Sequence, residues 1–301
     1  MATMKTIEIV APAHPLQVAF GALRSSRKQP GVVKALPKLC YALPSVVLDA
    51  DAIAAYCAVC GMAPEHGVPL IYPQLLTFPL ATAFMGSKAC PWPALGTVHL
   101  ANRIHQHHQL HIGDDLRIEM RTGILMTHEK GQVYNLEFTV LRDNILVWEA
   151  TQTLLRIGVA APSGAPYSSS FAASFATDTP LSHQTDFAAP ADIGRRYAKV
   201  SGDFNPIHLT ALSARVFGFR HAIAHGLWTT ARATAPLLPD HPLAQASLDV
   251  DFKTPLFLPS TASLWSTHSA HARGQHSALF EVRNAAGDKP HLRARLGYQA
   301  P

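Results

Sequence analysis

Cysteine and long apolar runs are both scarce in this 301-residue chain, and each shortage excludes a class of protein. Four cysteines are too few for a small scaffold held together by disulfides. No stretch approaches the roughly 18 apolar residues that a membrane-spanning helix needs. The apolar segment near the N-terminus is interrupted by Pro12 and Pro15, so we expect no signal peptide. These absences predict a cytoplasmic protein with no membrane partner.

Charge is also sparse, at 15% of residues, and the formal net charge is only +5. Lysine and arginine are scattered along the chain without the basic run that binds nucleic acid, so no nucleic-acid partner is expected. The small basic excess is compatible with a phosphorylated small-molecule ligand. Hydrophobic residues make up 48% of the chain, which is typical of a globular protein with one large or two medium domains.

An internal repeat divides the chain. The segments 56–62 and 197–203 share tyrosine, valine and glycine in register, and each is followed by an apolar, alanine-rich run typical of a helix, at 70–85 and 220–237. Each half then ends in strand-like runs, predicted at 116–126, 133–142, 145–157, 262–271, 277–283 and 291–299. This order, a helix, a long helix and then antiparallel strands, predicts an α+β fold.

The repeat also predicts the domain boundaries. Residues 1–158 form one half and residues 182–301 form the other. Residues 159–181, which are rich in alanine, serine and proline, form a linker.

The stretch 197–227, YAKVSGDFNPIHLTALSARVFGFRHAIAHGL, carries the chemistry. It places Asp203 and His208 five positions apart among turn-forming residues, and His225 and Gly226 open the apolar helical run. A carboxylate and an imidazole that share one water, next to free amides at a helix N-terminus, are what the addition or removal of water at an activated double bond requires.

The strings SGDFNPIH, GF and IAHG within this stretch resemble the motif of the MaoC-like, (R)-specific enoyl-CoA hydratases. The resemblance covers about thirty residues and implies a double hotdog fold, in which two antiparallel sheets each wrap around a long central helix and pair within one chain. It implies a hydro-lyase of fatty-acid metabolism that adds water reversibly, with syn geometry, to trans-2-enoyl-CoA and forms (R)-3-hydroxyacyl-CoA.

Each residue of the motif receives an expected role. Asp203 and His208 hold and activate the water, and Asn205 fixes the loop or orients a catalytic side chain. The amide of Gly226, near the start of the predicted central helix, stabilises the negative thioester oxygen. We expect glycine at this position because it would let the thioester approach the backbone.

Other residues are candidates for binding the substrate. His225 either contacts the thioester or only packs, while Lys253 is a candidate for the coenzyme A phosphates, as are Arg195 and Arg196. Coenzyme A enters as part of the substrate, and we expect no cofactor and no metal site. The Cys57–Cys60 pair lacks a second pair and indicates helix packing, and the histidines between residues 99 and 111 indicate a polar strand face.

The N-terminal half departs from the motif where the chemistry would lie. Met62 corresponds to Asp203, and Gly67 corresponds to His208. We therefore expect a catalytically empty copy that completes the fold and shapes the acyl-binding site.

Three alternatives to an acyl-CoA hydratase remain. A 3-hydroxyacyl dehydratase of fatty-acid or polyketide synthesis would use the same residues on acyl carrier protein. A hotdog thioesterase would aim water at the carbonyl, and an acyl-thioester binding protein would perform no reaction. The sequence allows either a monomer or a homodimer, since one chain already imitates a dimer.

Overall fold

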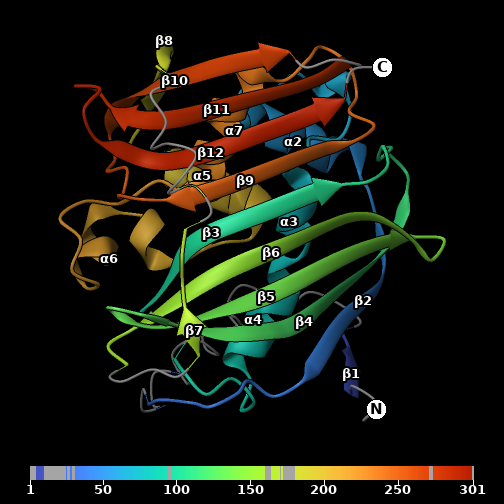
Figure 1. Ribbon diagram of the computed structural model, residues 1–301, viewed down its shortest axis with the longest axis vertical. Helices are drawn as coiled ribbons and strands as arrows, with labels where there is room; N and C mark the ends of the chain where they lie inside the picture. The colour runs from blue at the N-terminus through green and yellow to red at the C-terminus, as the bar shows by residue number, and fades with distance from the viewer. Residues whose placement is uncertain are drawn as a thin grey trace.

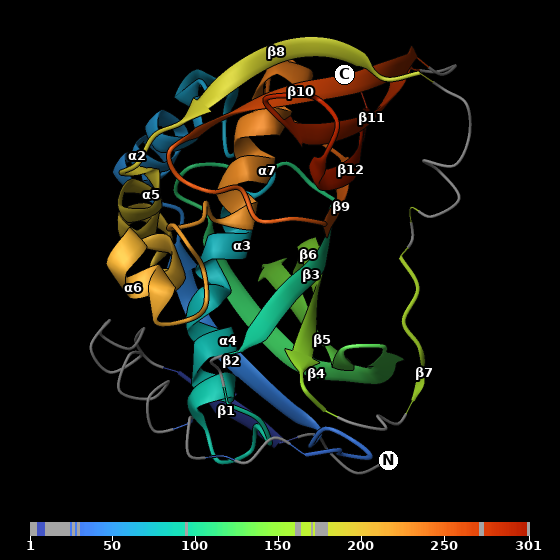
Figure 2. The same cartoon turned by 90° about the vertical axis from the view of Figure 1, so that its left-hand side faces the viewer.

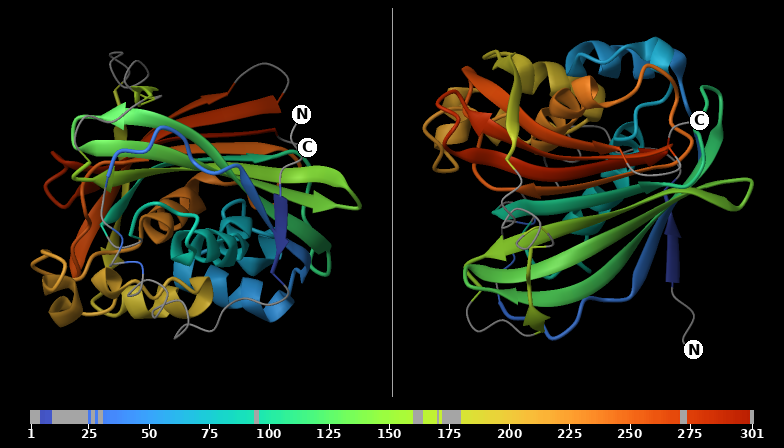
Figure 3. Two further views of the ribbon diagram at one scale, coloured as in Figure 1. Left: turned by 90° about the horizontal axis from the view of Figure 1, so that it is seen from below. Right: turned by 45° about the horizontal axis from the view of Figure 1, so that its top comes forward.

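One continuous sheet runs through both halves of the chain. The computed structural model describes residues 5–9, 25, 28, 31–93, 96–159, 164–169, 171, 180–270 and 274–299. The strands follow the order β1-β2-β4-β5-β6-β3-β9-β12-β11-β10-β8 across the sheet, which curves around the helices gathered on one of its faces (Figures 1 and 3). The expected double hotdog architecture therefore appears as two curved half-sheets merged at β3 and β9.

The N-terminal half supplies six principal strands. Its elements are β1 (Lys5–Glu8), β2 (Leu39–Val47), α2 (Ala50–Cys60), η1 (Pro64–His66), α3 (Tyr72–Leu76), α4 (Phe78–Gly86), β3 (Thr97–Gln106), β4 (Asp115–His128), β5 (Gly131–Arg142) and β6 (Ile145–Ile157). The helices α2, η1, α3 and α4 lie between its second and third strands. The short β7 (Ala165–Pro166) pairs in parallel with β4.

The C-terminal half repeats this order of a strand, several helices and then further strands. Its elements are β8 (Ser182–Ala189), α5 (Ile193–Ser201), η2 (Pro206–His208), α6 (Ala211–Arg215), α7 (Gly226–Thr234), η3 (Ala235–Leu237), β9 (Ala246–Phe252), β10 (Ser260–Ala270), β11 (Gln275–Asn284) and β12 (Pro290–Gln299). The six predicted strand runs all lie on strands, with ends that agree to within three residues.

Two expectations about the order of elements were wrong. Strands β2 and β8 directly precede α2 and α5, and both lie toward the outer ends of the sheet. The helical run predicted at 70–85 is broken at Thr77 into α3 and α4. Pro79 in the first turn of α4 has no N–H to continue the hydrogen bonds of α3, so the chain restarts there.

The two halves meet both in the sheet and in the helical layer. Strands β3 and β9 pair antiparallel, with Ile104 opposite Leu248, and both side chains are buried. On the helical side α2 packs against α5, and the repeated tyrosines Tyr56 and Tyr197 lie with ring centroids 6.3 Å apart (Figure 2). The repeat seen in the sequence therefore forms an internal pseudo-dimer whose shared contacts are largely buried.

The central helix of the C-terminal half is α7, which starts at Gly226. Its Trp228 is buried, and the indole Nε1–H donates to Val59 O of α2 at 3.0 Å. None of the helices within the described residues has the length and apolarity needed to cross a bilayer. The linker predicted at 159–181 lies largely outside the described residues, and the domain boundaries stay a prediction.

Candidate active site

Asp203 is positioned by the abrupt end of α5. Gly202 takes a left-handed conformation, with φ 74°, and its N–H donates to Ala198 O as the helix ends. The Asp203 carboxylate then accepts the backbone N–H of Asn205 at 3.1 Å through Oδ1. Its side chain is 30% exposed, which places the carboxylate at the edge of the buried site.

His208 ends the one-turn helix η2, where Pro206 lies in the first turn and the Asn205 side chain accepts the N–H of Ile207 at 3.4 Å. The imidazole is buried, and Nδ1 lies 2.8 Å from Ile223 O. A carbonyl oxygen can only accept, so Nδ1 carries the proton and Nε2 keeps a free lone pair. This tautomer makes His208 Nε2 a potential general base.

The backbone of η2 sits directly on α5. A Cβ built on Gly194 would lie 1.8 Å from His208 O, so only glycine allows this approach. The depth at which His208 is seated therefore depends on a glycine in a different helix.

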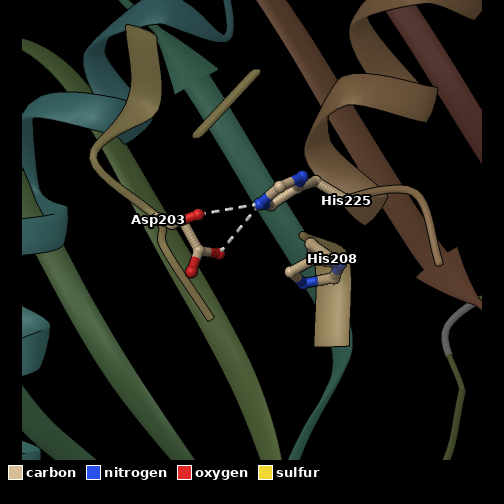
Figure 4. Close-up of side chains that lie close together, drawn as sticks. All are labelled: Asp203, His208 and His225. Atoms are coloured by element: carbon tan, nitrogen blue, oxygen red, sulfur yellow. Dashed lines mark hydrogen bonds and ion pairs between the residues drawn. The ribbon is translucent and has the colours of Figure 1, made fainter. Parts of the chain in front are cut away.

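His225 links the two catalytic candidates, as Figure 4 shows. Its ring stacks on His208 with centroids 3.8 Å apart, and its Nε2–H donates to the backbone O of Asp203 at 3.0 Å. The same nitrogen is 3.8 Å from Asp203 Oδ2. Because His225 is only 3% exposed, this geometry gives it a bracing position behind Asp203 and His208.

Burial keeps both imidazoles neutral. It lowers the pKa of His208 below its usual value, although the charge of Asp203 and the hydrogen bond to Ile223 oppose the shift. Burial, together with the neighbouring His208, lowers the pKa of His225 to about 3. At neutral pH the site therefore contains two uncharged imidazoles beside one carboxyl group.

Gly226 begins α7. The side chain of the N-cap residue, His225, does not form a capping hydrogen bond with the helix. The N–H groups of this first turn are therefore available to an anion or an oxyanion. The structure shows a packing constraint on this glycine: a Cβ at Gly226 would lie 2.6 Å from Cε1 of Phe252. The absence of a side chain here accommodates the Phe252 ring. The approach of the thioester to the Gly226 backbone stays a prediction.

His99 is a site residue that the sequence analysis missed. It lies on β3 of the other half, beside a bulge between His99 and Ala101, and its ring centroid is 4.8 Å from that of Phe252. Burial lowers the pKa of His99 to about 4, and the charge of Asp203 partly opposes the shift. Its Nε2 is buried without a hydrogen-bond partner among the described residues. The N-terminal half thus places an imidazole next to the Phe252 wall of the site.

The neighbouring histidines of β3 behave as the polar strand face that was expected. His105 is exposed and stacks on His107, whose Nε2 lies 3.1 Å from Glu149 Oε1. The bulge after His99 reverses the alternation of side chains along β3. His99 therefore faces the opposite side of the strand from His105.

The cationic candidates lie outside the Asp203 cluster. Lys253 Nζ forms an ion pair with the buried Asp251 at 3.1 Å, Arg195 donates to Leu209 O at 3.0 Å, and Arg196 is exposed. Their contacts with coenzyme A stay predictions.

Asp203, His208 and His225 also form the single cluster with metal-ligand spacing in the part of the chain that the structure describes, each offering an atom within 4.8 Å of the others. Two of the ring nitrogens already donate to carbonyl oxygens, His208 Nδ1 to Ile223 and His225 Nε2 to Asp203. These bonds favour a proton-transfer role for the cluster.

Comparison with known proteins identifies the family of this chain. The model of the MaoC like domain family matches residues 172–289, which include Asp203, His208 and Gly226. The chain is 32% identical over 268 residues to the 3-hydroxyacyl-thioester dehydratase X of Mycobacterium tuberculosis, covering 87% of this chain and 90% of that protein. The chain belongs to the MaoC-like dehydratase family.

Solved structures show the same fold for MaoC-like proteins. The crystal structure of HtdX from Mycobacterium tuberculosis has a TM-score of 0.68 at 29% identity, covering 85% of this chain and 98% of that one. A MaoC-like dehydratase from Phytophthora capsici gives 0.70 at 15% identity, over 88% and 96%. A Mycobacterium tuberculosis protein with a double hotdog fold gives 0.54 at 16% identity, over 85% and 93%. This MaoC-like dehydratase is a double hotdog protein.

Proposed function

We propose that this protein catalyses the reversible syn-hydration of trans-2-enoyl-CoA to (R)-3-hydroxyacyl-CoA in the cytoplasm, as a dehydratase and hydratase of acyl thioesters. One observation carries the proposal: Asp203 and His208 converge, with the free lone pair of His208 Nε2 held beside the N-terminus of α7. The printed activity of the relative from Mycobacterium tuberculosis supports the same class of substrate.

In the hydration direction, one water donates hydrogen bonds to the Asp203 carboxylate and to His208 Nε2. The water loses one proton to this pair as its oxygen bonds to C3 of the enoyl group. The C2=C3 π electrons move toward the thioester carbonyl, whose oxygen becomes negative. The pair then returns one proton to C2 from the same face, so that the net change is the addition of one water.

The negative oxygen forms opposite the free amides of α7. The N–H of Gly226 is the proposed donor, and one such donor lowers the activation barrier by about 3 kcal/mol in other enzymes. Asn205 holds the carboxylate of Asp203 through its backbone N–H. His225 positions the pair through its stacking on His208 and its hydrogen bond to the Asp203 backbone.

The decisive experiment follows the absorbance of the conjugated enoyl thioester during its hydration. We expect Asp203→Asn and His208→Gln each to lower kcat/KM by about 10²–10⁴-fold, because each removes a group that transfers a proton. His105→Gln is the matched control, since this exposed histidine lies outside the site. Circular dichroism should show native folding in all three variants.

Activity that survives in both site variants would overturn the mechanism. Release of free coenzyme A by the wild-type protein, measured with a thiol reagent, would instead indicate a thioesterase. In the reverse direction, a product formed from (S)-3-hydroxyacyl-CoA and not from the (R) epimer would contradict the proposed stereochemistry.

A further inference from the structure

The short helix α6 presents an unusual surface close to the catalytic loop. Leu212 and Val216 are 76% and 78% exposed, which makes them the most exposed large hydrophobic side chains in the described residues. They are four positions apart, so they lie on one face of the helical turn, and the exposed Arg215 lies beside them. Aliphatic side chains grouped in this way on a surface commonly mark a contact with another molecule.

The surroundings of α6 are strongly basic. Between residues 193 and 225 the chain has five lysines and arginines, and its single acidic residue is Asp203. All five cations are exposed, and none of them forms an ion pair with any residue that the structure describes. They are Arg195, Arg196, Lys199, Arg215 and Arg220.

Several of these side chains are fixed close to α6. Arg195 of α5 reaches across to Leu209 O, just before α6 begins, at 3.0 Å. Arg215 donates through Nε to Arg220 O at 3.4 Å, which keeps both ends of the α6 loop together. We call the set Arg195, Leu212, Arg215, Val216 and Arg220 the α6 surface.

The α6 surface is connected rigidly to the active site. The hydroxyl of Ser213 donates to Pro206 O at 2.7 Å, and Pro206 begins the turn that ends with His208. A capping box between Thr210 and Ser213 fixes the start of α6. Figures 1 and 2 show α6 at the margin of the helical layer, next to α5. A molecule bound to this surface would therefore be held beside the catalytic loop.

We propose that the α6 surface docks an acidic acyl carrier protein, which delivers the acyl group on its phosphopantetheine arm. This inference rests on the proposed reaction and adds acyl carrier protein as a second carrier of the same enoyl group beside coenzyme A. A helix with acidic and apolar side chains is complementary to the arginines and to the aliphatic pair. The phosphates of coenzyme A would match only the charges and would leave Leu212 and Val216 in water.

The charges act mainly on the rate of encounter. Exposed cations attract an acidic partner over a distance of about a Debye length, and salt screens this attraction. The aliphatic pair then adds a short-range contact that salt does not screen. Docking should therefore weaken with ionic strength without disappearing.

The first test is direct binding of a fluorescently labelled, acidic holo-acyl carrier protein. Leu212→Ser and Arg215→Glu should each weaken binding at least about tenfold, which corresponds to about 1.4 kcal/mol. Lys88→Glu is the control, because it makes the same change of charge at another exposed cation, which follows α4. Binding that is absent in the wild-type protein, or that weakens equally in the control, would overturn the proposal.

The second test compares turnover of one enoyl group on the carrier protein and on coenzyme A. Arg215→Glu should lower kcat/KM about tenfold for the carrier-bound substrate and leave the coenzyme A substrate unchanged. Equal losses on both substrates, or turnover of the coenzyme A substrate alone, would overturn carrier docking while the proposed reaction stands. Binding that depends on Arg215 without turnover of either substrate would retain the docking site and overturn the proposed reaction.

Discussion

At the scale of single residues, the site shows how burial gives one residue type different properties. His208 and His225 are buried and neutral, and each has one ring nitrogen committed to a backbone carbonyl. His99 is held near them with its Nε2 buried and without a partner among the described residues, whereas His105 on the same strand faces water. Desolvation penalises the charged imidazole and lowers the pKa of His99, His208 and His225.

The buried Nε2 of His99, which has no partner among the described residues, predicts a measurable pH dependence of stability. Its pKa is about 4 in the folded state and near 6.5 in an unfolded chain, so the unfolded state binds more protons between these values. Stability is therefore lost as the pH falls from 6.5 toward 4, by about 1.4 kcal/mol per pH unit for this group.

We expect His99→Phe to reduce that slope of the unfolding free energy by about 1.4 kcal/mol per pH unit, measured with urea between pH 6.5 and 4.5. His105→Phe is the matched control on the same strand and should leave the slope unchanged. A slope that is identical in the wild-type protein and the His99 variant would show that His99 is exposed to water in solution.

At the scale of elements, the N-terminus of α7 is shaped by its packing against β9. Gly226 has no side chain, and the ring of Phe252 fills the space where one would lie. The same ring contacts His99 of β3. Phe252, the last residue of β9, thus contacts both the predicted oxyanion donor Gly226 and strand β3 of the other half.

This contact predicts that Gly226→Ala will destabilise the protein by about 1–3 kcal/mol, because the methyl group would force the Phe252 ring aside. Adding Phe252→Leu to that variant should recover part of the loss, and urea unfolding of the two single variants and the double variant measures the coupling. Strictly additive effects would show that the loss arises elsewhere, for example from the backbone of α7.

At the scale of the whole molecule, the two halves share both a sheet and a core. Strands β3 and β9 join the half-sheets, Trp228 of one half donates to α2 of the other, and the repeated tyrosines meet between the helices. An extensive buried junction of this kind couples the halves, so neither should unfold independently.

Leu248→Ala tests this coupling, because the side chain is fully buried on β9 opposite Ile104. We expect a loss of about 2–5 kcal/mol, with a single transition whether unfolding is followed by far-ultraviolet circular dichroism or by tryptophan fluorescence. Two separated transitions, with only one of them shifted, would show that the halves unfold as independent domains.

The strands and the catalytic loop could be predicted because their signals are local. Alternating side chains and turn residues indicate strands, and Asp203 and His208 lie within one short segment of turn formers. The outer strands β2 and β8 were missed because each is defined by its pairing with a strand far away in the sequence. The division of the 70–85 run into α3 and α4 was also missed, although Pro79 marks it in the sequence.

The sequence by itself therefore determined the repeat, the α+β class and the segment that contains Asp203, His208 and Gly226. The tertiary structure alone decided that His225 stacks on His208, that His99 approaches from the other half, and that Phe252 fills the space where a side chain at 226 would lie. It also placed Arg195 of α5 beside the start of α6 and joined Arg215 to the backbone of Arg220. The physical reason is that these contacts join segments far apart in the sequence, and a single bulge in β3 changes which side chains face inward.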